Sequence, residues 1–323
     1  GLEIGKKILI NIKNINNIDG DWKNFRAPYS YDNKEWFRLN HTIIDLEKNI
    51  ISWDIIPRKN KIWFSYYPPY TFKRCEKIAK KYKCETIGTI QSKPIYYLKK
   101  GTGNKNVWII TRQHPGETIG SWMLEGFLIN LFKDKYKHIL DYYTFHIIVN
   151  ANPIGTIKGF WYTTDEGINM NRDWVNKESK NVQIISNKIL KTNCYLCIDL
   201  HGDEGAMKHF IAYCYENKSK MYNKINNILT QLNSNFRKTN YYKNNSSKDD
   251  ERSTNDCYYT GLTIEGAMKH DNDKDKTLQY TPIKIGKSIV NMFDILIKLS
   301  KRKHKKTLNK RKKNINKTIK KHK

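Results

Sequence analysis

The chain has 323 residues, enough for a large core and for more than one domain, and its 59 Lys and Arg against 31 Asp and Glu give a net charge of +28. No apolar run reaches the ~18 residues of a membrane-spanning helix, so the protein is not expected to cross a membrane. The first residues lack the apolar segment of a signal peptide, and an intracellular, cytoplasmic protein is expected.

Residues 1–67 contain short runs of β-forming residues, HTIIDL, NIISWDI and KIWFSYY, with polar turns between them. This pattern predicts a small all-β domain of the sandwich type. The prolines of the segment PPY end that domain. The periodic segment at 71–83 predicts a helix that opens the next one.

From residue 85 onward, predicted strands alternate with predicted helices. The strands are 85–91, 94–100, 106–113, 142–153, 194–201 and 258–266, and the helices are 118–133, 219–232 and 284–300. This order predicts an α/β domain over 68–300, with a central, largely buried sheet between helices. Ligands of such sheets bind at the carboxyl ends of the strands.

Cysteines are scattered along the chain, which favours reduced thiols in an intracellular setting. Cys194 and Cys197 have the spacing of a redox or zinc motif, but they lie in CYLCIDLH, which predicts a strand. Residues three apart on a strand point to opposite faces. We therefore predict that the two are thiols of the core or its margin.

Polar motifs follow the apolar strands. His114 and Glu117, in RQHPGE, are three residues apart in a tight turn, so both side chains could reach one ion. His201, in DLHGDE, ends another strand and offers a third ligand. Catalytic zinc takes three protein ligands and leaves one position for water. The spacing therefore predicts one zinc per chain.

A zinc-activated water also needs a base and a bound substrate. Glu265, in TIEG, ends a further apolar strand and is the candidate base. Asn171 and Arg172, in NMNRDW, are the candidate substrate-binding residues. The arginine suits two-pronged recognition of a carboxylate.

The motifs RQHPGE, NPIG, GINMNRDW, DLHGDE and TIEG occur here in the order of the zinc carboxypeptidases. The chain resembles most closely the cytosolic carboxypeptidase branch and its bacterial relatives, over roughly residues 50–300. The resemblance implies a mixed sheet of about eight strands flanked by helices, after a small β-domain. It also implies zinc on His114, Glu117 and His201, Glu265 as general base, and a substrate carboxylate on Asn171 and Arg172.

Two positions depart from the family pattern. Ile154 stands where NPDG has its aspartate, and Tyr162 stands where the family has an arginine that stabilises the oxyanion. Loss of one oxyanion donor typically lowers the rate by about 10²–10³-fold. The Tyr162 hydroxyl and Lys158 are the candidate replacements.

The resemblance implies hydrolysis of the C-terminal peptide bond of peptides or protein tails. Two other functions stay open. One is a zinc-dependent acylase or amidase acting on small N-acyl amino acids. The other is a catalytically weak carboxypeptidase-like binding protein, for which Tyr162 is the main support.

Specificity draws, in this family, on the segment upstream of the catalytic glutamate, here 243–265. Arg252 is its one arginine, and in the cytosolic branch a basic residue there selects a C-terminal glutamate. The resemblance and the positive charge therefore favour acidic C-termini. Asp249, Asp250 and Glu251 lie beside Arg252, and one of them facing the pocket would select lysine or arginine instead.

Residues 301–323 contain thirteen Lys and Arg and no acidic residue. Such a composition predicts a disordered tail. It could be a solvated tail, a nuclear-localisation signal, a nucleic-acid-binding arm or a contact for acidic partners.

Overall fold

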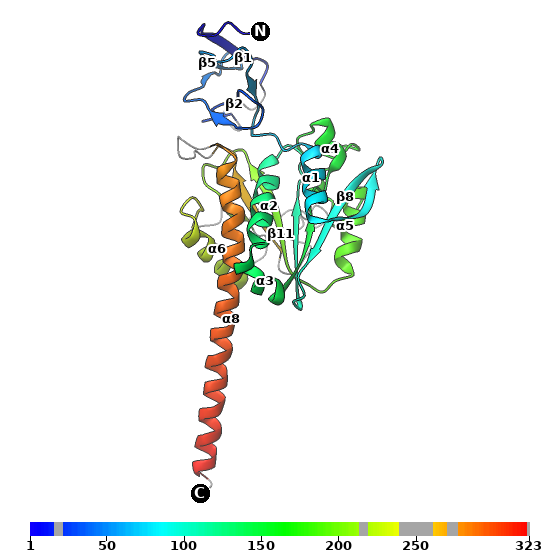
Figure 1. Ribbon diagram of the computed structural model, residues 1–323, viewed down its shortest axis with the longest axis vertical. Helices are drawn as coiled ribbons and strands as arrows, with labels where there is room; N and C mark the ends of the chain where they lie inside the picture. Colours follow the sequence, from blue (N-terminus) through cyan, green and yellow to red (C-terminus); the bar gives the residue numbers. More distant parts are fainter. Residues whose placement is uncertain (16–21, 213–218, 239–260, 270–276, 322–323) are drawn as a thin grey trace.

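The computed structural model describes residues 1–15, 22–212, 219–238, 261–269 and 277–321 (Figure 1). A small β-rich part lies at one end of the molecule, the α/β part lies in the middle, and the last helix projects from the other end. In the described residues, no helix is both long enough and apolar enough to cross a membrane.

The β-rich part consists of two three-stranded sheets. One has the order β1(Ile8–Ile12), β5(Ile50–Ile55), β4(Ile43–Asp45), and the other β3(Phe37–Arg38), β2(Pro28–Ser30), β6(Trp63–Phe64). In β5 the alternate residues Ile51 and Trp53 are buried, and they enter a core shared with Phe25 and Leu39. The all-β prediction for this part is confirmed.

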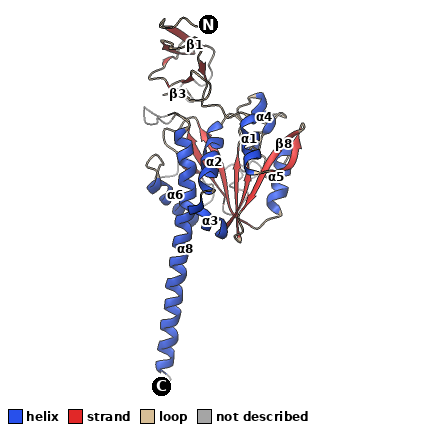
Figure 2. Cartoon of the chain, viewed as in Figure 1, coloured by secondary structure: helices blue, strands red, loops and turns tan. Residues whose placement is uncertain are grey.

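The second part is built on one sheet of seven strands among the described residues, with the order β12-β13-β11-β9-β10-β8-β7 (Figure 2). The strands are β7(Glu85–Ile90), β8(Lys93–Lys100), β9(Lys105–Thr111), β10(Tyr143–Ile148), β11(Cys194–Asp203), β12(Phe210–Ala212) and β13(Gly261–Ala267). The four central strands, β13, β11, β9 and β10, are parallel, and the others are antiparallel to their neighbours. The predicted mixed α/β sheet is confirmed.

Helices cover both faces of this sheet. The larger apolar cluster lies under α1(Phe72–Tyr82), α2(Thr118–Leu131), α3(Lys137–Tyr142), α6(Ser219–Leu232) and α8(Tyr280–Lys321). The smaller cluster, on the other face, lies under α4(Pro153–Lys158) and α5(Lys180–Leu190). Short 3₁₀ turns form at η1(Asp134–Tyr136) and η2(Met170–Arg172).

Helices α2 and α8 pack closely because glycines face each other where they meet. A Cβ on Gly126 would lie 2.3 Å from the carbonyl oxygen of Ile283, and one on Gly286 would lie 2.2 Å from that of Met123. Any larger residue at these positions would push the helices apart.

The order of the parallel strands explains where a site can form. The chain passes from β9 through α2 to β10 on one side, and then through α5 to β11 on the other side of β9. The two connections cover opposite faces, so a crevice opens at the carboxyl ends of β9 and β11. The turn after β9 carries His114 and Glu117, and the end of β11 carries His201.

The prediction for Cys194 and Cys197 was partly wrong. Cys197 is buried and Cys194 partly buried, as expected of core or marginal thiols, and neither is in a disulfide. However, both pack on the same apolar cluster rather than on opposite faces. The pairing of β11 with β9 shifts between Cys194 and Leu196. This irregularity inserts one extra residue into β11, which brings Cys194 and Cys197 to the same face of the sheet.

The last helix differs from the sequence expectation. α8 continues without interruption through Lys321, across most of the segment predicted to be a disordered tail (Figure 1). Lys and Arg are good helix formers, and a helix already started by packing on α2 can extend at little cost per residue. The described side chains from Lys301 to Thr307 are exposed.

Candidate active site

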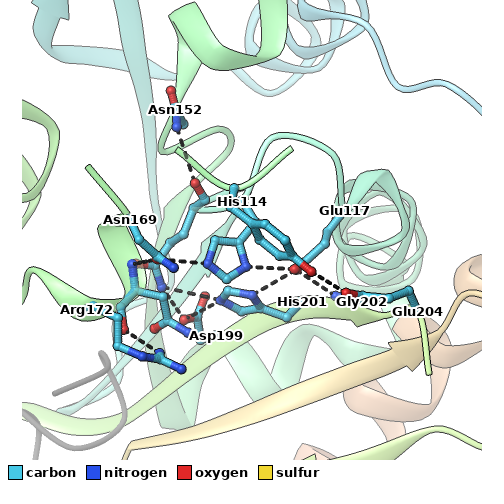
Figure 3. A network of polar contacts seen from close by, with 12 residues as sticks. His114, Glu117, Asn152, Asn169, Arg172, Asp199, His201, Gly202 and Glu204 are labelled. Carbon is cyan, nitrogen blue, oxygen red and sulfur yellow. Dashed lines mark hydrogen bonds and ion pairs between the residues drawn. The ribbon is translucent and has the colours of Figure 1, made fainter. Parts of the chain in front are cut away.

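Three buried side chains meet where β9 and β11 end (Figure 3). Nδ1 of His114 lies 2.7 Å from one carboxylate oxygen of Glu117, and Nδ1 of His201 lies 2.8 Å from the other. The backbone N–H of Gly202 also donates to that second oxygen, at 2.9 Å. The possible ligand atoms of these three residues all lie within 4.8 Å of one another. The structure thus brings together the three residues predicted as zinc ligands.

Each histidine is oriented by an acceptor on its far nitrogen. Nε2 of His114 lies 3.0 Å from Oδ1 of Asn169, and Nε2 of His201 lies 2.8 Å from Oδ2 of Asp199. An acceptor at Nε2 favours the proton there and leaves Nδ1 to bind a metal ion. Two imidazole nitrogens and one carboxylate, held in this way, fit the donor set of catalytic zinc.

Asp199 is itself held in place from the core. The Gln113 amide donates to Asp199 Oδ2, and the Trp174 indole N–H donates to Gln113 Oε1 at 2.7 Å. All three side chains are buried, with Asp199 only 1% exposed. Sequence reasoning missed Gln113, Asp199 and Asn169. The one available signal was that Asp199 lies two residues before His201 on a strand and so shares its face.

The charges around His201 explain why it can bind a cation. Burial by itself lowers the pKa of His201, but Asp199 and Glu117 on either side raise it well above its usual value. Burial likewise raises the pKa of Glu117, while His114 and His201 bring it well below its usual range. The carboxylate of Glu117 therefore stays ionised. A bound metal ion would supply the positive charge that a proton on His201 supplies in its absence.

Glu265 lies directly beside His201. The two residues are partners in the parallel pairing of β11 and β13, so their side chains share one face of the sheet. Burial raises the pKa of Glu265 well above its usual value. The positive charge of His201 opposes this effect, and the carboxylates of Glu117, Asp203 and Asp199 add to it. Oε2 of Glu265 has no hydrogen-bond partner within the described part of the chain. It is therefore placed to exchange a proton with a bound water or substrate.

The candidate substrate-binding residues come from the segment that orients His114. The backbone N–H of Asn171 donates to Oδ1 of Asn169 at 3.0 Å, the same oxygen that lies next to His114. Arg172 is exposed, and its Nη1 donates to the carbonyl oxygen of Asn171 at 2.8 Å. In Figure 3 Arg172 lies on the Asn169 side of the cluster, away from Glu117. Arg252 lies outside the described residues.

The positions that depart from the family pattern have different surroundings. Tyr162 packs edge-on against His114, with ring centroids 5.0 Å apart, and its hydroxyl donates to Glu204. Lys158 forms an ion pair with Asp165. Of the two candidate oxyanion donors, Tyr162 is the one in contact with a predicted ligand. Ile154 is buried in the apolar cluster under α5.

Asp199→Asn is expected to weaken zinc binding by about 10–100-fold, because a neutral amide makes His201 a weaker base and holds it less firmly. Titration of the metal-free protein with zinc, in competition with a chelator, measures the affinity. Asp165→Asn is the matched control, since Asp165 pairs with Lys158 and has no recorded contact with the three ligands. An unchanged zinc affinity in Asp199→Asn would show that the Asp199 carboxylate does not support His201 as a zinc ligand.

Comparisons with known proteins agree with this arrangement. Residues 73–322 match the zinc carboxypeptidase family model, and residues 2–67 match the cytosolic carboxypeptidase N-terminal domain. An uncharacterized protein of Zymomonas mobilis is 27% identical over 288 residues, which cover 81% of this chain and 75% of that protein. Cytosolic carboxypeptidase 2 of Xenopus tropicalis is 34% identical over 83 residues, which cover 25% of this chain but only 9% of that protein.

A solved structure is similar over nearly the whole chain. The crystal structure of a protein from Shewanella denitrificans, provisionally named carboxypeptidase A, has 26% sequence identity and a TM-score of 0.82. The similarity covers 90% of this chain and 86% of that one. The likeness therefore includes both the β-rich part and the α/β part.

Proposed function

This chain belongs to the zinc carboxypeptidase family, and from that premise we propose that it removes the last residue of peptides or protein tails at the cluster of His114, Glu117 and His201. The observation that carries the proposal is the convergence of the two Nδ1 atoms on the carboxylate of Glu117. Each histidine also has an acceptor on its other nitrogen, as a metal ligand requires.

Each group has a role in this reaction. Zinc held by His114, Glu117 and His201 would supply Lewis acidity, by polarising the scissile carbonyl and lowering the pKa of a water toward about 7. Glu265 accepts the proton of the attacking water and returns it to the leaving amine. Arg172, with Asn171, holds the terminal carboxylate, which restricts cleavage to chain ends.

We also propose that the Tyr162 hydroxyl takes the part of the missing family arginine. Its ring contacts His114, so a small rotation of the side chain would move the hydroxyl from Glu204 toward the cluster. A neutral phenol is a weaker donor than a guanidinium. Turnover is therefore expected to be slower than in a relative that has the arginine.

The preferred substrates are proposed to end in an acidic residue. The support is the likeness to cytosolic carboxypeptidases, the net charge of +28 and the position of Arg252 in the sequence. With matched peptides ending in Glu, Lys and Phe, kcat/KM is expected to be highest for Glu. Arg252→Ala should remove that preference and leave the rate on the Phe peptide unchanged. A preference for Lys would reverse the assignment and implicate the neighbouring acidic residues.

The same assay distinguishes the other functions. Hydrolysis of N-acyl amino acids without hydrolysis of peptides would favour the acylase or amidase. Zinc binding and peptide binding without turnover would favour a binding protein. Steady-state release of the C-terminal amino acid from the peptides supports the carboxypeptidase.

Three units are proposed in the chain: an N-terminal β-domain at 1–67, a catalytic domain at 68–300 and a basic segment at 301–323. We place the activity in the cytoplasm because the N-terminal match is to cytosolic carboxypeptidases. The basic segment would add nuclear localisation or a contact for nucleic acid or acidic proteins. It leaves the body at the end of the sheet opposite the site (Figure 1), so its role is separate from catalysis.

Deletion of residues 301–323 is expected to leave kcat/KM on short peptides unchanged and to remove salt-sensitive binding to RNA. Thirteen Lys and Arg lie in this segment without any acidic residue, and binding to phosphates weakens steeply as salt rises. Binding to labelled RNA over a series of salt concentrations measures the effect. Absence of RNA binding by the full chain at low salt would contradict the nucleic-acid role.

A further inference from the structure

Tyr66 joins the N-terminal β-rich part to the catalytic part. Its ring stacks on Phe25 at 5.0 Å and meets Trp22 edge-on at 5.4 Å, inside the N-terminal core. On its other side it meets Trp161 edge-on at 5.0 Å. Tyr66 packs against both the N-terminal apolar cluster and the larger cluster of the catalytic part. It is therefore a direct contact between two cores.

Trp161 in turn lies against the turn that carries two candidate ligands. The N–H of Gly116, between His114 and Glu117, donates to the carbonyl oxygen of Trp161 at 2.9 Å. A Cβ on Gly116 would lie 2.2 Å from the Trp161 ring, so the indole rests on the bare backbone of this turn. The next residue, Tyr162, contacts His114. Any shift of Trp161 would therefore displace both ligands and the candidate oxyanion donor.

A second set of contacts reaches the strand that carries Glu265. Nη2 of Arg38 donates to the carbonyl oxygen of Met268 at 2.7 Å, just after the end of β13. The N–H of Met268 donates to the carbonyl oxygen of Asp203, two residues after His201. Nζ of Lys269 donates to the carbonyl oxygen of Lys23 at 2.8 Å. The N-terminal part therefore contacts the segments on both sides of the cluster.

From these contacts we propose that the N-terminal domain is a positioning element of the active site, which acts through Tyr66 and Trp161 on the turn of His114 and Glu117. The proposal rests on the proposed function, in which these two residues bind zinc. A metal site needs its ligands held to within about 0.5 Å, so a turn that carries two ligands must be fixed by the residues packed against it. The Trp161 indole, pressed between Tyr66 and Gly116, supplies the missing support.

The test compares two substitutions of Tyr66 with one control. Tyr66→Leu removes the ring that meets Trp161, whereas Tyr66→Phe keeps it. The control is Phe64→Leu, which removes another half-buried ring from the same N-terminal core. Phe64 packs on Trp53, with ring centroids 5.6 Å apart, and does not stack on Trp161. The measurements are zinc affinity by chelator competition, the absorption spectrum of the Co²⁺-substituted protein, and kcat and KM on one peptide.

Tyr66→Leu is expected to weaken zinc binding by about 10-fold, to change the Co²⁺ spectrum, and to lower kcat more than it raises KM. Tyr66→Phe should match the wild type. Phe64→Leu should lower the unfolding temperature but leave zinc affinity and the Co²⁺ spectrum unchanged. Equal zinc loss in Tyr66→Leu and Phe64→Leu would mean that Tyr66 acts only through domain stability, and would overturn the proposal.

A double substitution tests whether the effect passes through Trp161. Trp161→Leu should weaken zinc binding, and adding Tyr66→Leu should weaken it no further, because the two residues act in series. Additive losses would overturn the proposal. If Tyr66→Leu does not fold, Trp161→Leu alone tests the proposal. An unchanged zinc affinity in Trp161→Leu would overturn it. The zinc and Co²⁺ measurements need no substrate, so they stand even if the protein hydrolyses no peptide.

Discussion

Glu265→Gln is expected to lower kcat by about 10²–10⁴-fold while zinc content and fold are retained. Glu265 lies beside His201 in the sheet, and its Oε2 has no hydrogen-bond partner among the described residues. Glutamine has nearly the same shape, but its amide cannot accept a proton from water. The loss would therefore fall on the chemical step rather than on metal or substrate binding.

Steady-state kinetics together with metal analysis check this result. Glu125→Gln is the control, because it removes a partly buried carboxylate of α2 that pairs with Arg74 of α1; near wild-type kcat is expected. If Glu265→Gln hydrolyses peptides at the wild-type rate, Glu265 has a structural role and another group is the base.

His201→Ala is expected to reduce bound zinc from about one ion per chain to a small fraction and to abolish peptidase activity, because one of three protein ligands is lost. The substitution also leaves Glu117 and Asp199 buried without the imidazole that lies 2.8 Å from each. Metal analysis of protein purified without chelator measures the loss.

A buried histidine outside the candidate site provides the control. His146 lies on β10, where Nδ1 lies 2.7 Å from the Tyr97 hydroxyl, and burial, together with Lys99 and Lys188, lowers its pKa to about 4. His146→Gln should therefore keep the zinc. Stoichiometric zinc that persists in both His114→Ala and His201→Ala would exclude the proposed site and point to the cysteines.

Local patterns in the sequence predicted the α/β class and most strands of the sheet, but they did not predict α4, α5 or β12. Apolar runs at 106–113 and 194–201 became β9 and β11, and the periodic segment at 118–133 became α2. Strands buried on both faces and helices with an apolar stripe are local patterns, which each segment carries without reference to the others. Polar residues at the ends of such strands were enough to indicate His114, Glu117, His201 and Glu265, because parallel strands end at a common edge.

Which side chains hold these candidate site residues in place was decided only by the tertiary structure. Asn169 meets His114 from 55 residues away, and Gln113 reaches Asp199 from 86 residues away. No periodicity connects such positions, since their meeting depends on the strand order and on the pairing register. A single shift in the pairing of β11 also brought Cys194 to the face of Cys197.

The same distinction applies to the ends of the chain. Composition predicted disorder for 301–323, but α8 is started by its packing on α2 and continues from there through Lys321. The sequence indicated a separate β-domain, yet it gave no sign that Tyr66 would contact Trp161 beside the ligand turn. Local patterns determined which elements form and which residues carry chemistry. Long-range packing decided which side chains hold them in place, because those contacts exist only after distant segments have met.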